Sequence, residues 1–182
     1  MSLKKGDGDA CHQGTLGTRK QRSEIKHHIW QDRFYTIDFD LKYSGKAGGA
    51  SVFQIHPGKP AHIAAHSAQE CEGVDVQAGF YALRLTVPGL IERKRVTAGD
   101  DYKDTWHSIK VVLRASNGRD GVYKVFVDGE KAFDSTEISR AAKVCYFPGG
   151  KAMVKLGLYR GQSDYEERVE YRGINLREGV FY

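Results

Sequence analysis

The chain has 182 residues, enough for one domain with a sizeable core and too few for two. Hydrophobic residues make up 40% and charged residues 28%, as in an ordinary soluble globular protein. No stretch approaches the roughly 20 apolar residues of a membrane span. The net charge of +5 is spread along the chain, and no nucleic-acid-binding motif is present. We therefore expect no nucleic-acid and no membrane partner; an acidic polysaccharide fits the charge.

Residues 1–20 are polar and glycine-rich without periodicity, and they are predicted to form an N-terminal arm. Residues 1–5 lack the apolar core of a signal peptide and resemble an added junction. We expect the arm to be either truncated or added, and a native signal peptide to be missing. Residues 21–182 are predicted to form a single domain. Cys11, Cys71 and Cys145 match no zinc or redox spacing and leave their pairing open.

Alternating apolar and polar residues, which are typical of half-buried antiparallel strands, recur along the chain. In chain order, the expected strands are 22–28, 35–43, 51–56, 81–87, 107–113, 122–127, 131–133, 152–160 and 166–176. Asp128-Gly129 predicts a tight hairpin turn, and residues 137–144 are compatible with a short helical turn. The pattern predicts an all-β fold, an antiparallel β-sandwich of two sheets.

Three of these segments place polar side chains together on one face of a strand. Because successive side chains point to opposite faces, Gln54 shares a face with His56, and Lys155 shares a face with Tyr159. The first segment places four polar residues on one face: Arg22, Glu24, Lys26 and His28. An arginine, a glutamine, a histidine and a tyrosine on one sheet face would suit binding a carboxylate and moving a proton beside it.

The strings Arg22-Ser23-Glu24, Gln54-Ile55-His56 and Met153-Val154-Lys155-Leu156-Gly157-Leu158-Tyr159 resemble, in this order, the motifs of the alginate-lyase family of polysaccharide lyases. The resemblance covers most of residues 20–180 and implies a concanavalin A-like jelly roll. Related lyases of this fold act on glucuronan and heparin. Met153-Val154 stands where the family has an aromatic pair, and Lys26 where it has arginine, which bears on the substrate more than on the reaction.

The resemblance implies β-elimination, in which a uronic acid loses its C5 proton and the C4–O bond breaks. Arg22 and Gln54 would neutralise the substrate carboxylate. His56 would be the base or help this neutralisation, and Tyr159 would be the acid, or acid and base together. Substrate-binding positions would be Lys155, Glu24, Lys26, Arg84 and His28. The chemistry requires no metal or organic cofactor. The expected substrate is alginate-type first, and glucuronan or another glucuronate polymer second.

Several alternatives remain open at this point. The same residues would also serve a non-catalytic, lectin-like sandwich that holds sugar without cleaving it. Arg84, Lys110 and Arg172 either line a basic groove or are solvated charges. The sequence does not decide whether His56 or Tyr159 takes the proton, which uronate is preferred, or whether cutting is endo or exo. We expect a secreted or periplasmic monomer.

Overall fold

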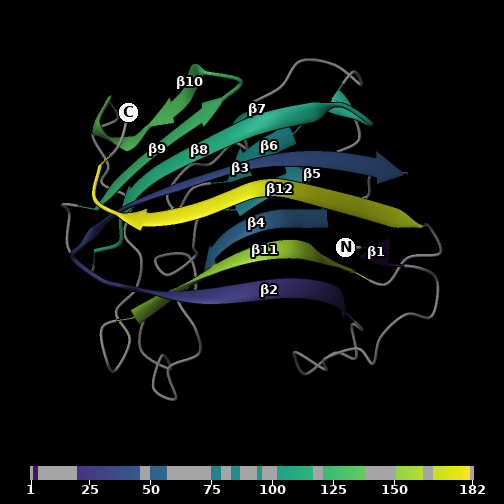
Figure 1. The fold of residues 1–182 in the computed structure, drawn as a ribbon, viewed down its shortest axis with the longest axis horizontal. Coiled ribbons are helices and arrows are strands. Elements are labelled where there is room, and N and C mark those ends of the chain that lie inside the picture. Colours follow the sequence, from purple (N-terminus) through teal and green to yellow (C-terminus); the bar gives the residue numbers. More distant parts are fainter. Residues whose placement is uncertain are drawn as a thin grey trace.

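The computed structural model describes residues 2–3, 20–45, 50–56, 75–78, 83–86, 94–95, 102–116, 121–137, 151–161 and 166–180. Its strands form two antiparallel sheets packed face to face (Figure 1). The predicted all-β sandwich is therefore confirmed. None of the described segments is a helix with the length and hydrophobicity needed to span a membrane. The three cysteines lie outside the described residues.

Within the described residues, each sheet has six strands. Sheet A runs in the order β1 (Ser2–Leu3), β12 (Glu167–Glu178), β3 (Phe34–Gly45), β8 (Trp106–Arg114), β9 (Val122–Val127) and β10 (Glu130–Asp134). Sheet B runs in the order β2 (Lys20–Trp30), β11 (Lys151–Gly161), β4 (Ala50–His56), β5 (Asp75–Ala78), β6 (Leu83–Thr86) and β7 (Lys94–Arg95). A 3₁₀ turn, η3 (Ser135–Glu137), follows β10.

The core lies between the sheets and follows the alternation of the strands. In β3 the residues that face the core are buried, namely Tyr35, Ile37, Phe39, Leu41 and Tyr43; on the other face Thr36 is buried too, and Asp38, Asp40 and Lys42 are partly exposed. Phe39 meets Phe53 of sheet B across the sandwich, with 5.4 Å between ring centroids. Because each fully buried side chain of this size contributes about 1.5–3 kcal/mol, this face of β3 commits the strand to the core and leaves its polar face outside.

The predicted hairpin at Asp128-Gly129 is confirmed. Both residues have positive φ angles, 53° and 84°, as the tight turn between β9 and β10 requires. The Asp128 carboxylate accepts the backbone N–H of Ser108 at 2.9 Å and so ties the turn to β8. A 3₁₀ turn, η3, covers residues 135–137 and overlaps the expected helical turn only at Glu137; residues 138–144 lie outside the described part of the chain, so that expectation stays a prediction.

Two short strands of sheet B were not predicted, β5 and β7. Asp75-Val76-Gln77-Ala78 does alternate, but four residues give too short a pattern to separate a strand from a loop. Within the predicted arm, Ser2–Leu3 pair with Glu167 and Arg168 of β12. The boundary between arm and domain stays a prediction.

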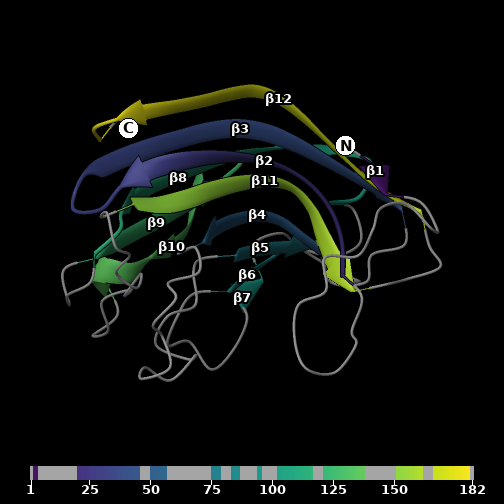
Figure 2. The same cartoon turned by 90° about the horizontal axis from the view of Figure 1, so that it is seen from below.

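Both sheets bend in the same direction, with β12 and β3 on the outer side and β4–β7 on the inner side (Figure 2). The outward face of sheet B is therefore concave, and the outward face of sheet A is convex. The polar faces of β2, β4 and β11 belong to sheet B, so the curvature puts the three strings on the concave side.

Substitution of phenylalanine for either of two buried tyrosines is expected to have opposite effects on stability. Tyr43 and Tyr123 are both fully buried. The Tyr43 hydroxyl donates to the buried carboxylate of Glu167 at 2.7 Å, whereas the Tyr123 hydroxyl finds no hydrogen-bond partner among the residues that the structure describes. Tyr43→Phe is expected to lower the free energy of unfolding by about 1–3 kcal/mol, and Tyr123→Phe to leave it unchanged or raise it by about 1 kcal/mol. Urea denaturation measures both; equal losses would contradict the expectation.

Candidate functional site

The sequence strings that are distant along the chain become neighbouring strands of sheet B. β11 lies between β2 and β4 and pairs with both. The register gives three rows: Tyr159 with Arg22 and Ser51, Lys155 with Lys26 and Gln54, and Met153 with His28 and His56. Residues directly opposite in an antiparallel ladder share a face, with Cβ atoms about 4.5–5.5 Å apart. The predicted positions on β2, β4 and β11 therefore lie on three adjacent strands of one sheet, spread over three separate rows.

Several of these side chains are accessible. Gln54 and Tyr159 are partly exposed, and Lys26 and His28 are exposed. Lys155 is buried, with 8% of its surface accessible. For Arg22, His56 and Arg84 the structure describes the backbone, and their place comes from the register. An amide, a phenol and ammonium groups thus stand on one concave surface, where they can meet a carboxylate.

Arg84 extends one of these rows away from β11. It lies opposite Gln77 of β5, and Gln77 lies opposite Ser51 of β4. The row of Tyr159 therefore crosses five neighbouring strands. In strand order it contains Arg22, Tyr159, Ser51, Gln77 and Arg84. Sequence reasoning missed Ser51 and Gln77, and the short alternation of β5 was the signal that pointed to the second.

Lys155 and Tyr159 share a face of β11, as their spacing predicts, but they belong to different rows of the sheet. The two residues are four apart on β11, about 13 Å between Cα atoms at the usual rise of a strand. Lys155 lies opposite Gln54 and Lys26 instead. Lys155 therefore belongs to the row of Gln54 and not to the row of Tyr159.

His56 and Tyr159 lie at different ends of the predicted site. Tyr159 is opposite Ser51, and His56 is five residues further along β4. At the rise of a strand, their rows are roughly 16 Å apart. Gln54 lies between them. The site is therefore elongated along β4 and β11, which fits a polymer lying along the strands better than a single sugar.

The strand carrying Tyr159 contains a β-bulge next to that residue. Leu156 pairs with Phe53 and Tyr159 with Ser51, so Gly157 and Leu158 oppose Val52 alone. Gly157 has a φ of 150°, a conformation that is essentially confined to glycine. On its other side β11 keeps an unbroken register with β2. The bulge therefore shifts Tyr159 relative to β4 without disturbing its place beside Arg22.

A tyrosine of the other sheet, which sequence reasoning missed, reaches this bulge. The Tyr171 hydroxyl of β12 accepts the Gly157 N–H at 3.0 Å and donates to the carbonyl oxygen of Val52. Burial raises the pKa of Tyr171; the Gly157 hydrogen bond acts in the opposite direction, and the charge of Glu24 adds to the rise. Tyr171 therefore stays protonated and holds backbone rather than moving a proton.

Glu24 of β2 lies directly opposite Gly157 of β11. Its Oε2 atom is buried and has no hydrogen-bond partner among the described residues. In the part of the chain that the structure describes, no group of three or more His, Cys, Asp or Glu side chains is arranged to hold a metal ion.

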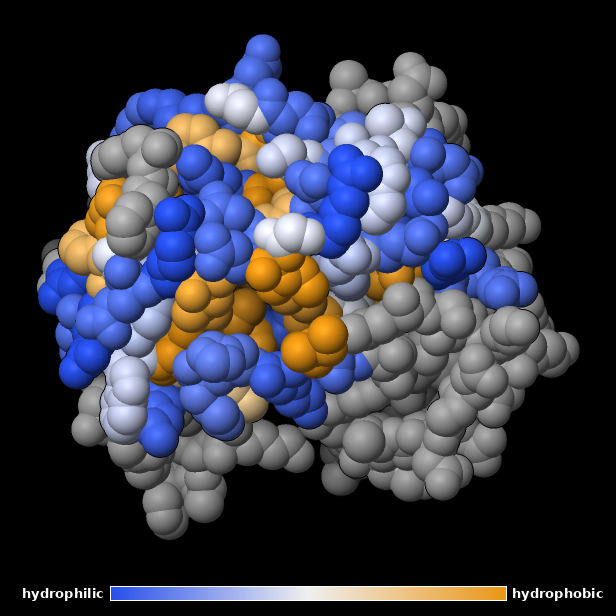
Figure 3. Space-filling view, in the orientation of Figure 1, coloured by the Kyte–Doolittle hydropathy of each residue, from blue (hydrophilic) through white to orange (hydrophobic). Residues whose placement is uncertain are grey.

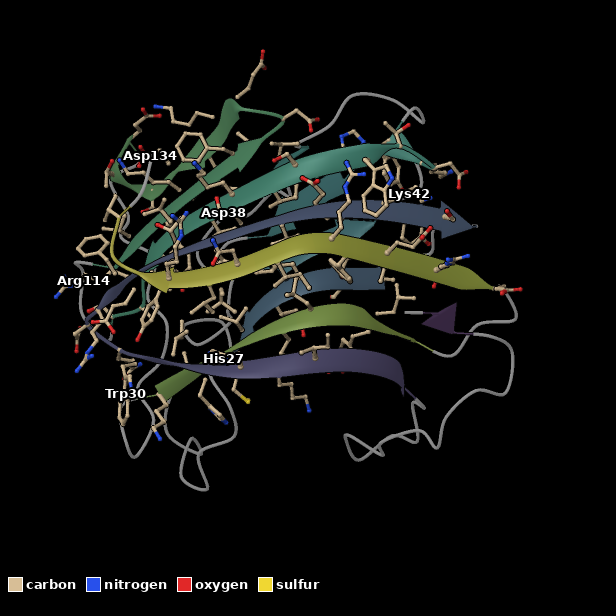
Figure 4. All side chains as sticks on the ribbon, viewed as in Figure 1. His27, Trp30, Asp38, Lys42, Arg114 and Asp134 are labelled. Atoms are coloured by element: carbon tan, nitrogen blue, oxygen red, sulfur yellow. The ribbon has the colours of Figure 1, made fainter. Side chains whose placement is uncertain are left out.

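The convex face of sheet A carries many charges, but its carboxylates are paired with its own cations. Arg172 donates to Asp40 at 2.9 Å, and Lys42 lies 2.9 Å from Glu170, which holds the pKa of that carboxyl below its usual value. Figure 3 shows hydrophilic residues over much of this face, with apolar residues gathered near its middle, and Figure 4 shows Asp38 and Lys42 on β3. A depression of about 280 Å³ on this face is lined by Ser108, Lys110, Phe126 and Gly129.

Two candidates for a basic groove are thereby corrected. Lys110 and Arg172 belong to sheet A, on the far side of the sandwich from Tyr159. Lys110 lies 3.9 Å from Asp38, and Arg172 also packs on the Trp106 ring at 4.2 Å. Of the three candidates only Arg84 lies on sheet B, where its row reaches Tyr159.

The bulge predicts that substitution of Gly157 lowers stability more than substitution of Gly173. Gly157→Ala is expected to lower the free energy of unfolding by about 1–3 kcal/mol, because its φ of 150° strains a residue with a Cβ. The control is Gly173→Asn, since Gly173 has a φ of 62°, which asparagine adopts, and a Cβ there meets nothing within 4 Å. We expect the control to change stability by less than about 1 kcal/mol. Denaturation curves measure both, and a larger loss in the control would contradict the assignment of strain.

Comparison with known protein families gives a match to most of the chain. The family model described as "Polysaccharide lyase" matches residues 1–173. None of the curated proteins compared with the chain matches it.

Several solved structures share the fold. An endo-β-1,4-glucuronan lyase from the fungus Trichoderma reesei has 13% sequence identity and a TM-score of 0.59, covering 92% of this chain and 77% of that chain. The marine PL7 alginate lyase AlyA1 from Zobellia galactanivorans has 13% identity and a TM-score of 0.55, covering 91% and 73%. The carbohydrate recognition domain of Emp46p has 12% identity and a TM-score of 0.52, covering 90% and 80%. At these identities the likeness shows the sandwich fold.

Proposed function

Because the chain belongs to the polysaccharide lyase family, we propose that it cleaves a uronic-acid-containing polysaccharide by β-elimination. One observation carries the proposal: the register of β2, β11 and β4 brings Arg22, Gln54 and Tyr159 to one concave surface. These residue types supply the two things that β-elimination needs, which are neutralisation of a carboxylate and transfer of a proton.

Neutralisation comes first, because the C5 proton is hardly acidic while the neighbouring carboxylate keeps its full charge. Donors placed on that carboxylate stabilise the negative charge that develops as the proton leaves. Gln54 offers an amide N–H, and Lys155 lies directly opposite it. Arg22, opposite Tyr159, offers a planar fork of donors that suits a carboxylate. We assign the carboxylate to the space between these rows.

Tyr159 is assigned the proton transfers. Its phenol is partly exposed between Arg22 and Ser51. His56 lies roughly 16 Å further along β4, too far to share the same C5 proton and leaving oxygen. We therefore propose that Tyr159 serves as both base and acid, with the proton and leaving group on one side of the sugar, and that His56 and His28 hold the polymer further along the site.

An alginate-type polymer is the first substrate, and a glucuronate polymer such as glucuronan is the second. The three strings support the first, because they resemble alginate-lyase motifs. Met153-Val154 in place of the aromatic pair supports the second, as does the shared fold with the fungal glucuronan lyase. Since such polysaccharides are met outside the cell, we propose that the protein acts there, either secreted or in a periplasm. We also propose that it acts as a monomer.

Ultraviolet absorbance tests the reaction directly. Each elimination leaves a conjugated C4–C5 double bond, which hydrolysis and simple binding do not produce. The protein is mixed separately with polymannuronate, polyguluronate, glucuronan and heparin. A rise with one polymer establishes the reaction and names the substrate class. If none reacts and one binds, the lectin-like alternative replaces the lyase; the carbohydrate recognition domain with the same fold favours that alternative.

Removal of one hydroxyl tests the assignment of Tyr159. Tyr159→Phe is expected to lower kcat by about 100- to 10,000-fold, the usual contribution of a positioned acid or base, with little change in KM. The control is Tyr35→Phe, whose hydroxyl accepts the backbone N–H of Trp30 at 3.0 Å, away from the site. Steady-state kinetics on the reactive polymer measure both variants. Retention of kcat in Tyr159→Phe would remove this residue from the mechanism.

The negative charge of the proposed substrate predicts that loss of an exposed lysine on sheet B weakens binding. Lys26 is exposed on the row of Gln54, so Lys26→Gln is expected to raise KM about two- to five-fold, as loss of an exposed ion pair does. Added salt screens that attraction and should shrink the difference. Lys131→Gln is the control, because Lys131 is also exposed but lies on β10 and pairs with Glu137. An equal rise in KM for both variants would show that overall charge, and not this face, attracts the polymer.

A further inference from the structure

We propose that Tyr171 is a positioning residue for Tyr159: it reaches across the sandwich and holds the bulge that sets where Tyr159 lies on the concave face. Tyr171 lies on β12 in the other sheet, and its hydroxyl bonds to backbone on both sides of the bulge. The inference rests on the proposed function, because it gives a role in the reaction to a residue on the core side of sheet B.

The bulge changes the position of Tyr159 by one residue of β4. From the pairing of Leu156 with Phe53, a regular ladder would continue with Leu158 opposite Ser51 and Tyr159 opposite Ala50. The observed ladder puts Tyr159 opposite Ser51. This moves Tyr159 toward Gln54 by about 3.3 Å, the rise of one residue in a strand. A shift of that size is decisive for proton transfer, which requires hydrogen-bond distances.

The bulge has a cost that Tyr171 removes. Where two residues oppose one, the ladder is disrupted and backbone groups lose their partners. Buried N–H and C=O groups need replacements. Val52 is fully buried, and the Tyr171 hydroxyl donates to its carbonyl oxygen while accepting the Gly157 N–H at 3.0 Å. One hydroxyl therefore satisfies a donor on β11 and an acceptor on β4.

Tyr171 is itself held in place, as a positioning residue must be. Its ring packs edge-on against Phe39 of β3, with 5.9 Å between centroids. Its backbone lies opposite Leu41 in the ladder between β12 and β3. Phe39 in turn stacks on Phe53, the residue that precedes the bulge in register. A packed chain of three rings thus connects sheet A to the strand opposite Tyr159.

Tyr171→Phe tests this by removing the hydroxyl and keeping the ring. We expect kcat to fall about 10- to 100-fold, with KM within about three-fold of the wild type, since a misplacement near 1 Å costs on the order of 100-fold. The matched control is Tyr35→Phe, which also removes a tyrosine hydroxyl that accepts a backbone N–H of sheet B, here at Trp30. The control should lose a similar amount of stability and keep its kcat.

A second readout does not depend on activity. The ring resonance of Tyr159 is identified by tyrosine-selective labelling and its disappearance in Tyr159→Phe. We expect this resonance to shift in Tyr171→Phe and to stay in place in Tyr35→Phe. In the wild type, the Gly157 amide should exchange with solvent as slowly as its ladder neighbours; fast exchange overturns the proposal even if the variant fails to fold.

The outcomes separate this inference from the proposed function. An active wild type whose Tyr171→Phe variant keeps both kcat and the Tyr159 resonance overturns the positioning role and leaves the lyase intact. A wild type inactive on every polymer, whose Tyr159 resonance still moves in Tyr171→Phe, overturns the proposed function and supports the structural coupling. Equal losses of kcat in Tyr171→Phe and Tyr35→Phe reduce the effect to stability and overturn the inference.

Discussion

The site depends on the position of β11 between β2 and β4. Antiparallel pairing on both sides fixes which residues of three distant segments stand side by side. The alternation of the strand fixes which of them face outward, because Ala152, Val154, Leu156 and Leu158 are buried in the core. A register slip of one residue would turn every one of these side chains to the other face. The same apolar burial that stabilises the sandwich therefore assembles the polar surface.

The positively charged side chains have different surroundings on the two outward faces of the sandwich. On sheet A, carboxylates such as Asp38 and Asp40 alternate with cations and pair with them across strands. Such a face is solvated and internally balanced, and exposed pairs of this kind contribute little to stability. On sheet B, Lys26 of β2 lies directly opposite Lys155 of β11. Two neighbouring ammonium groups attract anions, so this face would suit an acidic polymer.

Much of this arrangement follows from local sequence patterns. The long alternations of β3, β4, β8 and β11 predict the strands and the faces of Gln54 and Tyr159, because burial of one face is a strong constraint over seven or more residues. The Asp128-Gly129 turn is predictable because few residues adopt positive φ. The short strands β5 and β7 escape prediction, since two to four residues carry no clear period. Lys110 and Arg172 show the limit of alternation, which gives a polar face but not the sheet that carries it.

The bulge is a harder case, because its cause lies in another part of the chain. Gly157 suggests a departure from regular strand geometry, but a glycine in a strand is consistent with several explanations. The partner that makes the bulge tolerable, Tyr171, is fourteen residues away, in the opposite sheet. Nothing in the alternation of β12 separates it from an ordinary core tyrosine such as Tyr43. Only the packing of the two sheets reveals that its hydroxyl meets the Val52 carbonyl group and the Gly157 amide.

This dependence links the geometry of the site to the integrity of the sandwich. β12 pairs with β3 along most of its length, and on its other side the described residues pair it with β1 at Glu167 and Arg168. Strand edges with few partners open at lower free energy than the centre of a sheet. The bonds from Tyr171 to sheet B anchor β12 at mid-strand, so opening of this edge would release the bulge beside Tyr159. The strand that carries the proposed acid and base is thus held in register by a residue that belongs to the opposite layer of the core.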